Sequence, residues 1–418
     1  MILFSTTLSI LLSIGACKNS ESHPVAAEAL TAATDTTIRT GAEQSDVWLP
    51  KVQGKTIALV VNQTSMIGNR HLVDTLVSLG VQVSVIFAPE HGFRGTEDAG
   101  ATILNAKDTA TGIPVISLYG AKKKPAYNDL TDAEVVIFDI QDVGARFYTY
   151  ISTLHYVMEA CAEFNKPLIV LDRPNPNGFY VDGPVLESGY SSFVGMHPVP
   201  VVHGMTIGEY ARMINGEGWL ANKAQCKLEV ITCAHYDHTK YYTITIPPSP
   251  NLRTMRAIYL YPSLCFFEGA QVSVGRGTDK PFELYGSPHL PAIKAAPGMY
   301  PAPLTFTPKP GPGSTSPPFM HTNCQGFDIS GISAEKLRDS VLHKQLYLQP
   351  LLGAYARFDD RGQFFLENNF FNKLAGNAEF MMQIKSGLTE EEIRISWQDD
   401  LAAFKQVRKK YLLYPDFE

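Results

Sequence analysis

Between residues 56 and 171, short apolar runs alternate with longer segments in which apolar residues recur every three or four positions. The longest periodic segment, residues 149–164, places Ile151, Leu154, Val157 and Cys161 on one face, which predicts a helix. A shorter helix is expected over residues 71–79, ended by Gly80. The apolar runs predict strands at residues 56–61, 81–88, 113–119, 135–140 and 168–171. This alternation predicts an α/β fold with a mainly parallel sheet covered by helices on both faces.

The sharpest break in the chain is the proline-rich segment Ile246-Pro-Pro-Ser-Pro-Asn251. We place a domain boundary there, with a first domain at residues 47–250 and a second at residues 251–418. Capping boxes at Thr206/Glu209 and Thr389/Glu392 mark two helix starts. The second precedes a last helix whose buried stripe should contain Trp397, Leu401, Phe404 and Tyr411.

The first residues resemble a bacterial lipoprotein signal peptide. Residues 3–14 form an apolar run too short to span a bilayer, and small residues then precede Cys17. We therefore expect a signal peptide at residues 1–17 and a lipid anchor on Cys17 that holds the protein in the cell envelope, in the periplasm or at the outer membrane. Residues 18–46 contain few large apolar side chains and are expected to form a disordered tether.

Composition argues against several classes of function. The formal charge of −6 comes without an extended basic stripe, which disfavours a nucleic-acid partner. The compact basic run Lys122-Lys-Lys124 fits a solvated loop or, alternatively, a patch that steers an anionic polymer. The cysteines form neither a disulfide framework nor a metal knuckle. No glycine-rich dinucleotide or phosphate loop is found, so no cofactor is indicated.

Many polar side chains fall at or just beyond the carboxyl ends of the predicted strands. Because parallel strands share that edge of the sheet, these side chains are expected to converge on one cleft. They are Asn62, Glu90, His91, Asp139, Gln141, Asp142, Arg146, Asp172, Arg173 and Asn175. Glu90 lies just beyond the apolar strand, in the segment Ala88-Pro-Glu-His, and is the candidate catalytic acid.

Several of these segments together resemble the exo-β-N-acetylmuramidases, bacterial peptidoglycan glycosidases once catalogued as a domain of unknown function. The matching blocks are Ala88-Pro-Glu-His-Gly-Phe-Arg-Gly95, Asp139-Ile-Gln-Asp-Val-Gly-Ala-Arg-Phe-Tyr-Thr-Tyr150, Leu171-Asp-Arg-Pro-Asn-Pro-Asn-Gly178, His203-Gly-Met-Thr206, Pro248-Ser-Pro-Asn251 and Val274-Gly-Arg-Gly-Thr278. The resemblance implies a Rossmann-like catalytic domain and a smaller α+β carboxyl-terminal domain with an interdomain cleft between them. It also implies release of N-acetylmuramic acid from the non-reducing ends of peptidoglycan fragments, with Glu90 as the catalytic residue. One departure is Glu268-Gly-Ala-Gln271, where the family pattern leads us to expect Glu-Gly-Thr-Asn.

Glycosidic cleavage usually needs a second carboxylate, and spacing does not choose among the aspartates. The candidate catalytic residues are Glu90, His91, Asp139, Asp142 and Asp172. The candidate substrate-binding residues are Asn62, Gln141, Arg146, Tyr148, Arg173, Asn175, His203, Asn251, Glu268 and Arg276. The substrate's own acetamido group is an alternative nucleophile.

Among the binding residues, Arg146 and then Arg276 are the expected partners of the lactyl carboxylate, while Arg173 is expected to brace Asp172. His203 either faces the cleft or bonds to nearby backbone. Two other functions stay open. One is a lipoprotein that binds a wall sugar without cutting it, and the other is a metal-dependent hydrolase that uses Glu90, His91, Asp139 and His203.

Overall fold

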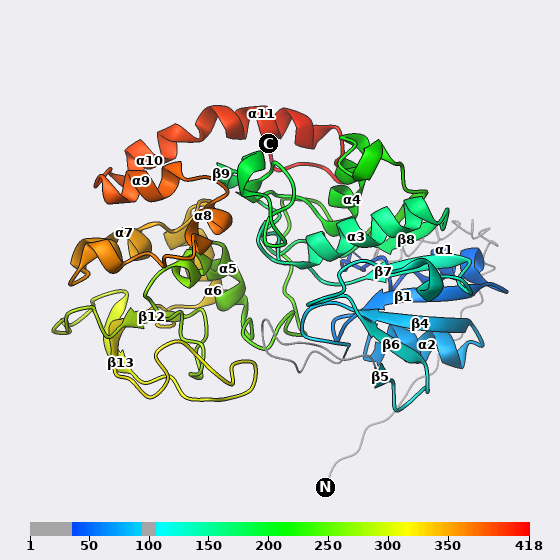
Figure 1. The fold of residues 1–418 in the computed structure, drawn as a ribbon, viewed down its shortest axis with the longest axis horizontal. Coiled ribbons are helices and arrows are strands. Elements are labelled where there is room, and N and C mark those ends of the chain that lie inside the picture. Colours follow the sequence, from blue (N-terminus) through cyan, green and yellow to red (C-terminus); the bar gives the residue numbers. More distant parts are fainter. Residues whose placement is uncertain (1–35, 94–105) are drawn as a thin grey trace, which may run out of the picture. The chain divides into compact units, whose positions relative to one another are not determined.

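The predicted parallel sheet is present in the computed structural model, which describes residues 36–93 and 106–418. In this part of the chain the sheet has seven strands in the order β11-β8-β7-β1-β4-β6-β5 (Figure 1). All neighbouring strands pair in parallel except β5, which is antiparallel to β6. The strands are β1 (Thr56–Val61), β4 (Gln82–Ala88), β5 (Ala106–Lys107), β6 (Pro114–Ser117), β7 (Val135–Asp139), β8 (Leu168–Leu171) and β11 (Leu228–Ile231). The parallel strands thus follow a Rossmann order, with its topological switch point between β1 and β7.

Successive residues of the strands point to opposite faces, and each face carries its own helices. Ala58 and Val60 of β1 pack in the core cluster that contains the apolar residues of α3 (Tyr150–Glu163) and α4 (Ile207–Gly216). Ile57 and Leu59 pack in the cluster that contains those of α1 (Ser45–Val52) and α2 (Leu72–Ser78), including Trp48. The strand sequences are continuous runs of apolar residues because helices cover both faces of the sheet.

The helices match most of the expected positions. The described helices are α1 (Ser45–Val52), α2 (Leu72–Ser78), α3 (Tyr150–Glu163), α4 (Ile207–Gly216), α5 (Met255–Leu264), α6 (Ala334–Leu337), α7 (Gln349–Arg357), α8 (Phe370–Ala375), α9 (Glu379–Lys385), α10 (Glu390–Ser396) and α11 (Gln398–Lys409). The capping boxes of Thr206 and Thr389 open α4 and α10. The expected last helix divides at Trp397 into α10 and α11. Tyr411, expected on its buried stripe, lies beyond α11 and is only half-buried.

The second half of the chain forms the smaller α+β part. It contains an antiparallel sheet in the order β12 (Leu284–Ser287), β14 (Cys324–Asp328), β13 (Ala302–Phe306). Helices α5 to α10 belong to this half (Figure 1). Short hairpins β2 (Met66–Ile67)/β3 (Arg70–His71) and β9 (Asp182–Val185)/β10 (Pro200–Val202) complete the described strands.

The tether was expected to run to residue 46, and its last ten residues are folded instead. The folded unit begins at Thr37. Gly41 donates its N–H to the carbonyl of Asp172 (2.7 Å), and Ala42 is fully buried and accepts a hydrogen bond from the indole of Trp48 (3.1 Å). These small residues fit against the end of β8, so a low content of large apolar residues did not mean disorder here. The signal peptide, Cys17 and the tether up to residue 35 lie outside the described residues.

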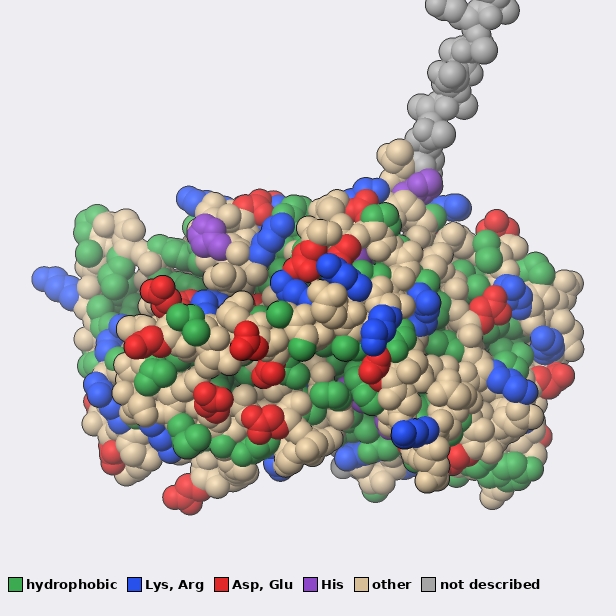
Figure 2. Space-filling model, turned by 90° about the horizontal axis from the view of Figure 1, so that it is seen from above, with side chains coloured by type: hydrophobic (Ala, Val, Ile, Leu, Met, Phe, Trp, Pro, Cys, Tyr) green, Lys and Arg blue, Asp and Glu red, His purple; other side chains and the backbone are tan. Residues whose placement is uncertain are grey.

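Within the described ranges, no helix is both long and apolar enough to cross a bilayer. On the face shown in Figure 2, Lys and Arg side chains are interspersed with Asp and Glu side chains and with hydrophobic ones.

Candidate active site

A cavity of about 420 Å³ lies beyond the carboxyl end of β4, and both halves of the chain line it. The first half contributes Glu90, His91, Tyr148 and Thr149, and the second contributes Glu268 and Arg276. Small-ligand sites in proteins occupy roughly 300–1,000 Å³. The cavity is therefore large enough for a small ligand, and it brings together five of the residues predicted from sequence.

The backbone after β4 turns sharply and so projects Glu90 into this cavity. Pro89, which has no N–H to continue the sheet, follows the last strand residue. His91 and Gly92 then adopt φ values of 72° and 78°, and the N–H of Gly92 bonds to the carbonyl of Pro89 at 3.0 Å. A positive φ is uncommon for a non-glycine residue and marks a conformation that the surroundings must hold in place. Buried His91 thus anchors the turn that presents half-buried Glu90.

A hydroxyl group orients the Glu90 carboxylate. Thr149, the residue before α3, donates from Oγ1 to Oε2 of Glu90 at 2.7 Å. Tyr119, which follows β6, lines the same cavity as Glu90. Burial and then the Glu90 carboxylate raise the pKa of Tyr119 well above its ordinary value, so this phenol remains a donor at neutral pH.

Aromatic side chains form the wall beside Glu90. The rings of Tyr148 and Tyr150 meet edge to face with centroids 4.8 Å apart, and Tyr150 donates to the carbonyl of Pro248 at 2.8 Å. Burial raises the pKa of both phenols. Tyr148 lines the cavity, and so does Ser249 of the Pro-Ser-Pro-Asn block.

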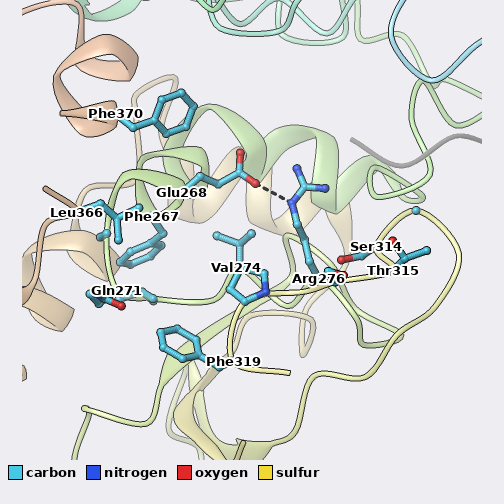
Figure 3. A pocket seen from close by; sticks show the side chains of 15 residues that line it. Phe267, Glu268, Gln271, Val274, Arg276, Ser314, Thr315, Phe319, Leu366 and Phe370 are labelled. Carbon is cyan, nitrogen blue, oxygen red and sulfur yellow. Dashed lines mark hydrogen bonds and ion pairs between the residues drawn. The ribbon is translucent and has the colours of Figure 1, made fainter. Parts of the chain in front are cut away.

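Glu268 and Arg276 lie between this cavity and a larger one of about 730 Å³, since both cavities include these two residues and Phe370. Arg276 Nε donates to Oε1 of Glu268 at 2.6 Å, the contact drawn in Figure 3. Figure 3 also shows Phe267, Phe319 and Phe370 around the larger cavity, together with Gln271 from the block that departs from the family pattern. The two cavities thus adjoin at an ion pair.

The crevice at the topological switch point, where Rossmann folds usually bind ligands, is largely filled. Asn62 accepts hydrogen bonds from the N–H and hydroxyl of Thr64 (2.9 and 2.6 Å). Arg173 forms a two-pronged ion pair with fully buried Asp139 at 2.6 and 2.9 Å, rather than bracing Asp172 as expected. Only about 70 Å³ remains there. The candidate active site therefore lies at the end of β4 and not at the switch point, and the buried Asp139 carboxylate is not accessible to a ligand.

Asp172 and Asp142 also do not line the Glu90 cavity. Asp172 accepts hydrogen bonds from Thr206 (2.7 Å), the N–H of Gly208 (2.8 Å) and Tyr414, and so joins β8 to α4 and the carboxyl-terminal tail. Burial raises its pKa to about 6. Asp142 accepts from the N–H of Gly144 (2.7 Å), and burial raises its pKa to about 7. Its other carboxylate oxygen is buried with no hydrogen-bond partner among the described residues.

Arg146 was expected to bind the lactyl carboxylate, and the structure contradicts this. Its side chain is fully buried, and its two terminal nitrogens donate to four backbone carbonyls. The acceptors are Pro184 (2.7 Å) and Val199 (2.8 Å), and Leu374 and Ala375 (both 2.7 Å). Burial lowers the pKa of Arg146 to about 9, so it is still charged at neutral pH. Arg146 therefore fastens α8 to the β9–β10 region and has no donor left on these nitrogens for a ligand.

The side chains of the remaining predicted binding residues form hydrogen bonds with backbone groups. Gln141 donates to the carbonyls of Asp142 and Pro174 (both 2.8 Å), and Asn175 donates to that of Met205 (2.8 Å). Asn251 donates to the carbonyl of Gly313 (2.6 Å). His203 accepts from the N–H of Met205, and burial lowers its pKa to about 3. These side chains bond to backbone groups because burying a polar group without a hydrogen-bond partner is costly.

Asp139 and His203 do not line the cavity that contains Glu90 and His91, because each of them bonds to other buried groups. In the part of the chain that the structure describes, no group of three or more His, Cys, Asp or Glu side chains could hold a metal ion.

Among the residues of the cavity that sequence reasoning missed as members of the site are Tyr119, Lys123, Thr149 and Phe193. Thr149 lies inside the block that ends at Tyr150, and Tyr119 ends a predicted strand, so both carried a usable signal. Phe193 lies in a loop without a motif, and only the tertiary structure brings it to Glu90.

Two family models together match most of the chain. The family model described as exo-beta-N-acetylmuramidase NamZ, N-terminal, matches residues 57–256, and the corresponding C-terminal model matches residues 259–414. The predicted boundary at 250/251 stays a prediction. The chain is 36% identical over 379 residues to the peptidoglycan beta-N-acetylmuramidase NamZ of Bacillus subtilis (strain 168), covering 87% of this chain and 88% of that protein.

Crystal structures of two DUF1343 family proteins from Bacteroides fragilis NCTC 9343 share the fold. The first is 43% identical with a TM-score of 0.81, and the match covers 91% of this chain and 99% of the other. The second is 30% identical with a TM-score of 0.74, covering 90% and 99%. The chain therefore belongs to the exo-β-N-acetylmuramidase NamZ family of glycoside hydrolases.

Proposed function

We propose that this protein releases N-acetylmuramic acid from the non-reducing ends of peptidoglycan fragments, with Glu90 as the general acid. The observation that carries the proposal is the Glu90 carboxylate, which is presented by a strained turn into an adequately sized cavity and is oriented by Thr149. A general acid must lie within hydrogen-bond reach of the leaving oxygen, and a fixed carboxyl in a small cavity meets that requirement.

The second carboxylate of the reaction is Glu268 in this proposal. Asp139, Asp142 and Asp172 are excluded from the role because none of them lines the cavity, and among the described residues that do, Glu268 is the other carboxylate. Arg276 fixes it through Nε at 2.6 Å. Retaining enzymes hold their two carboxyl groups about 5 Å apart and inverting ones roughly 6.5–9.5 Å apart, with a water between them. If the Glu268→Gln variant is still active, the substrate's acetamido group is the nucleophile in place of a second carboxylate.

The test is incubation of purified protein with a defined disaccharide ended by N-acetylmuramic acid, followed by mass analysis of the products. Release of free N-acetylmuramic acid is expected, and the anomer formed first, read by proton NMR, separates retention from inversion. Binding of the disaccharide without any cleavage would instead establish the alternative, a wall-sugar-binding lipoprotein.

We also propose that the mature chain is anchored to the cell envelope by a lipid on Cys17. The apolar run before Cys17 and the start of the folded unit at Thr37 support a short tether between anchor and enzyme. Metabolic labelling with a fatty acid should mark the wild-type protein but not Cys17→Ala. Equal labelling of both would contradict the anchor.

A further inference from the structure

The basic run Lys122–Lys124 uses its three charges in different ways. Lys122 pairs with Asp129 (2.5 Å), and Lys124 pairs with Glu159 (2.7 Å) and Glu163 (2.5 Å). Two of the three charges are thus compensated on the protein surface.

Lys123 lines the Glu90 cavity. Its ammonium lies 4.7 Å from the centre of the Phe193 ring, which itself packs against Tyr119 at 5.9 Å. A cation over an aromatic face is attracted by the ring, so Phe193 fixes where the ammonium lies. Within residues 36–93 and 106–418, Lys123 makes no ion pair.

Among the residues that the structure describes, the other cations near the cavity already have partners. Arg276 bonds to Glu268 and lies 5.1 Å from the Phe282 ring, and Arg146 is enclosed by four carbonyls. A half-buried ammonium that pairs with no carboxylate of the described residues, held inside a ligand-sized cavity, is suited to bind an anionic group of the ligand.

We propose that Lys123 binds the carboxylate of the lactyl ether on the sugar in this cavity, and so selects a muramic acid over a glucosamine. The inference rests on the proposed function, because that function supplies a ligand with one carboxylate. It replaces Arg146, and ranks ahead of Arg276, as the residue that recognises the acid. Lys123 is in this sense a specificity-determining residue.

The test compares Lys123→Met with Lys122→Met and Lys124→Met, which remove the same charge from the same loop. Each variant is assayed on para-nitrophenyl β-N-acetylmuramide and on the corresponding glucosaminide. For Lys123→Met we expect KM for the muramide to rise roughly tenfold to a hundredfold, the range for a hydrogen bond to a charged group. Turnover of the glucosaminide should not change, and Lys123→Arg should recover part of the loss. The two control variants should keep the wild-type preference.

A binding measurement keeps the inference separate from catalysis. Wild-type protein should bind N-acetylmuramic acid more tightly than its methyl ester by calorimetry, and Lys123→Met should bind both equally weakly. This result would support the role of Lys123 even if no substrate were cleaved, which would refute only the proposed activity. Equal losses on both chromogenic substrates, with a shifted pH–rate profile, would show that Lys123 acts on Glu90 and would overturn the inference. So would an unchanged preference for the acid in Lys123→Met.

Discussion

The hydroxyl of Thr149 donates to the Glu90 carboxylate across a sequence separation of 59 residues. Thr149 stands at the amino-terminal boundary of α3, yet its side chain caps no backbone N–H of that helix. Serine and threonine at this position usually form such a cap. Here the hydroxyl is directed to Glu90 instead, so its contribution belongs to the site and not to the helix.

Thr149→Val should therefore lower kcat about tenfold to a hundredfold while leaving the thermal unfolding temperature nearly unchanged. The variant keeps the shape of the side chain but loses one hydrogen bond to a charged group. Thr149→Ser restores the donor and should recover most of the activity. Failure of the serine variant to recover would show that the methyl group, not the hydroxyl, matters for positioning.

Glu90→Gln should remove general acid catalysis without unfolding the protein. Such catalysis is typically worth about 10² to 10⁴ in rate, and the loss should appear in kcat with KM little changed. An aryl muramide should retain more activity than the natural disaccharide because a nitrophenolate leaves without protonation. Near-complete loss on both substrates would indicate that Glu90 also activates water or acts as the nucleophile. Wild-type rates on the disaccharide would remove Glu90 from the mechanism.

Arg146→Met should destabilise the fold without changing substrate preference. Four buried carbonyls lose their donor, which we expect to lower the free energy of unfolding by about 3–5 kcal/mol. Urea unfolding measures this loss. Exposed Arg361, which donates to the single carbonyl of Ala356, is a matched control whose Met variant should cost less than about 1 kcal/mol. A selective loss on muramides in Arg146→Met would return Arg146 to substrate binding.

Asp142→Asn should stabilise the protein above neutral pH. The pKa of Asp142 is raised from 3.8 to about 7 in the folded state. The folded state therefore binds more protons than the unfolded state between these values, and stability is lost as the pH rises through about 7. Asparagine carries no such charge, so the variant should gain on the order of 2–4 kcal/mol over wild type at about pH 8 and little at about pH 4. Urea unfolding of both proteins at both pH values measures this difference. A gain in the free energy of unfolding that is equal at the two pH values, or larger in acid, would contradict the raised pKa of Asp142.

A chain that begins at Thr37 should fold and act like the full-length protein, whereas one that begins at Val47 should be less stable. The shorter chain loses buried Ala42 and the bond from Gly41 to Asp172 (2.7 Å). We expect a loss of about 2 kcal/mol or more in the free energy of unfolding. Identical unfolding curves for the two chains would show that residues 37–46 add nothing to the fold.

The sequence alone determined the sheet and the position of Glu90 on it. Strands β1 and β8 match the predicted ranges, and the capping boxes of α4 and α10 were read correctly. These features depend on local periodicity, on capping chemistry and on the rule that parallel strands share one carboxyl edge, all of which are written in neighbouring residues. The family resemblance was likewise visible in continuous blocks.

Only the tertiary structure decided which polar residues at that edge face the cavity. Asp139, Arg173 and Arg146 lie at or just beyond strand ends, as Glu90 does. Their partners nevertheless come from distant segments, because Asp139 pairs with Arg173 and Arg146 bonds to Leu374 and Ala375. A buried ion pair or guanidinium must be satisfied by whichever groups the fold brings near it, and sequence spacing does not encode those neighbours. For the same reason Lys123, one of three adjacent lysines, could be separated from Lys122 and Lys124 only once their carboxylate partners were placed.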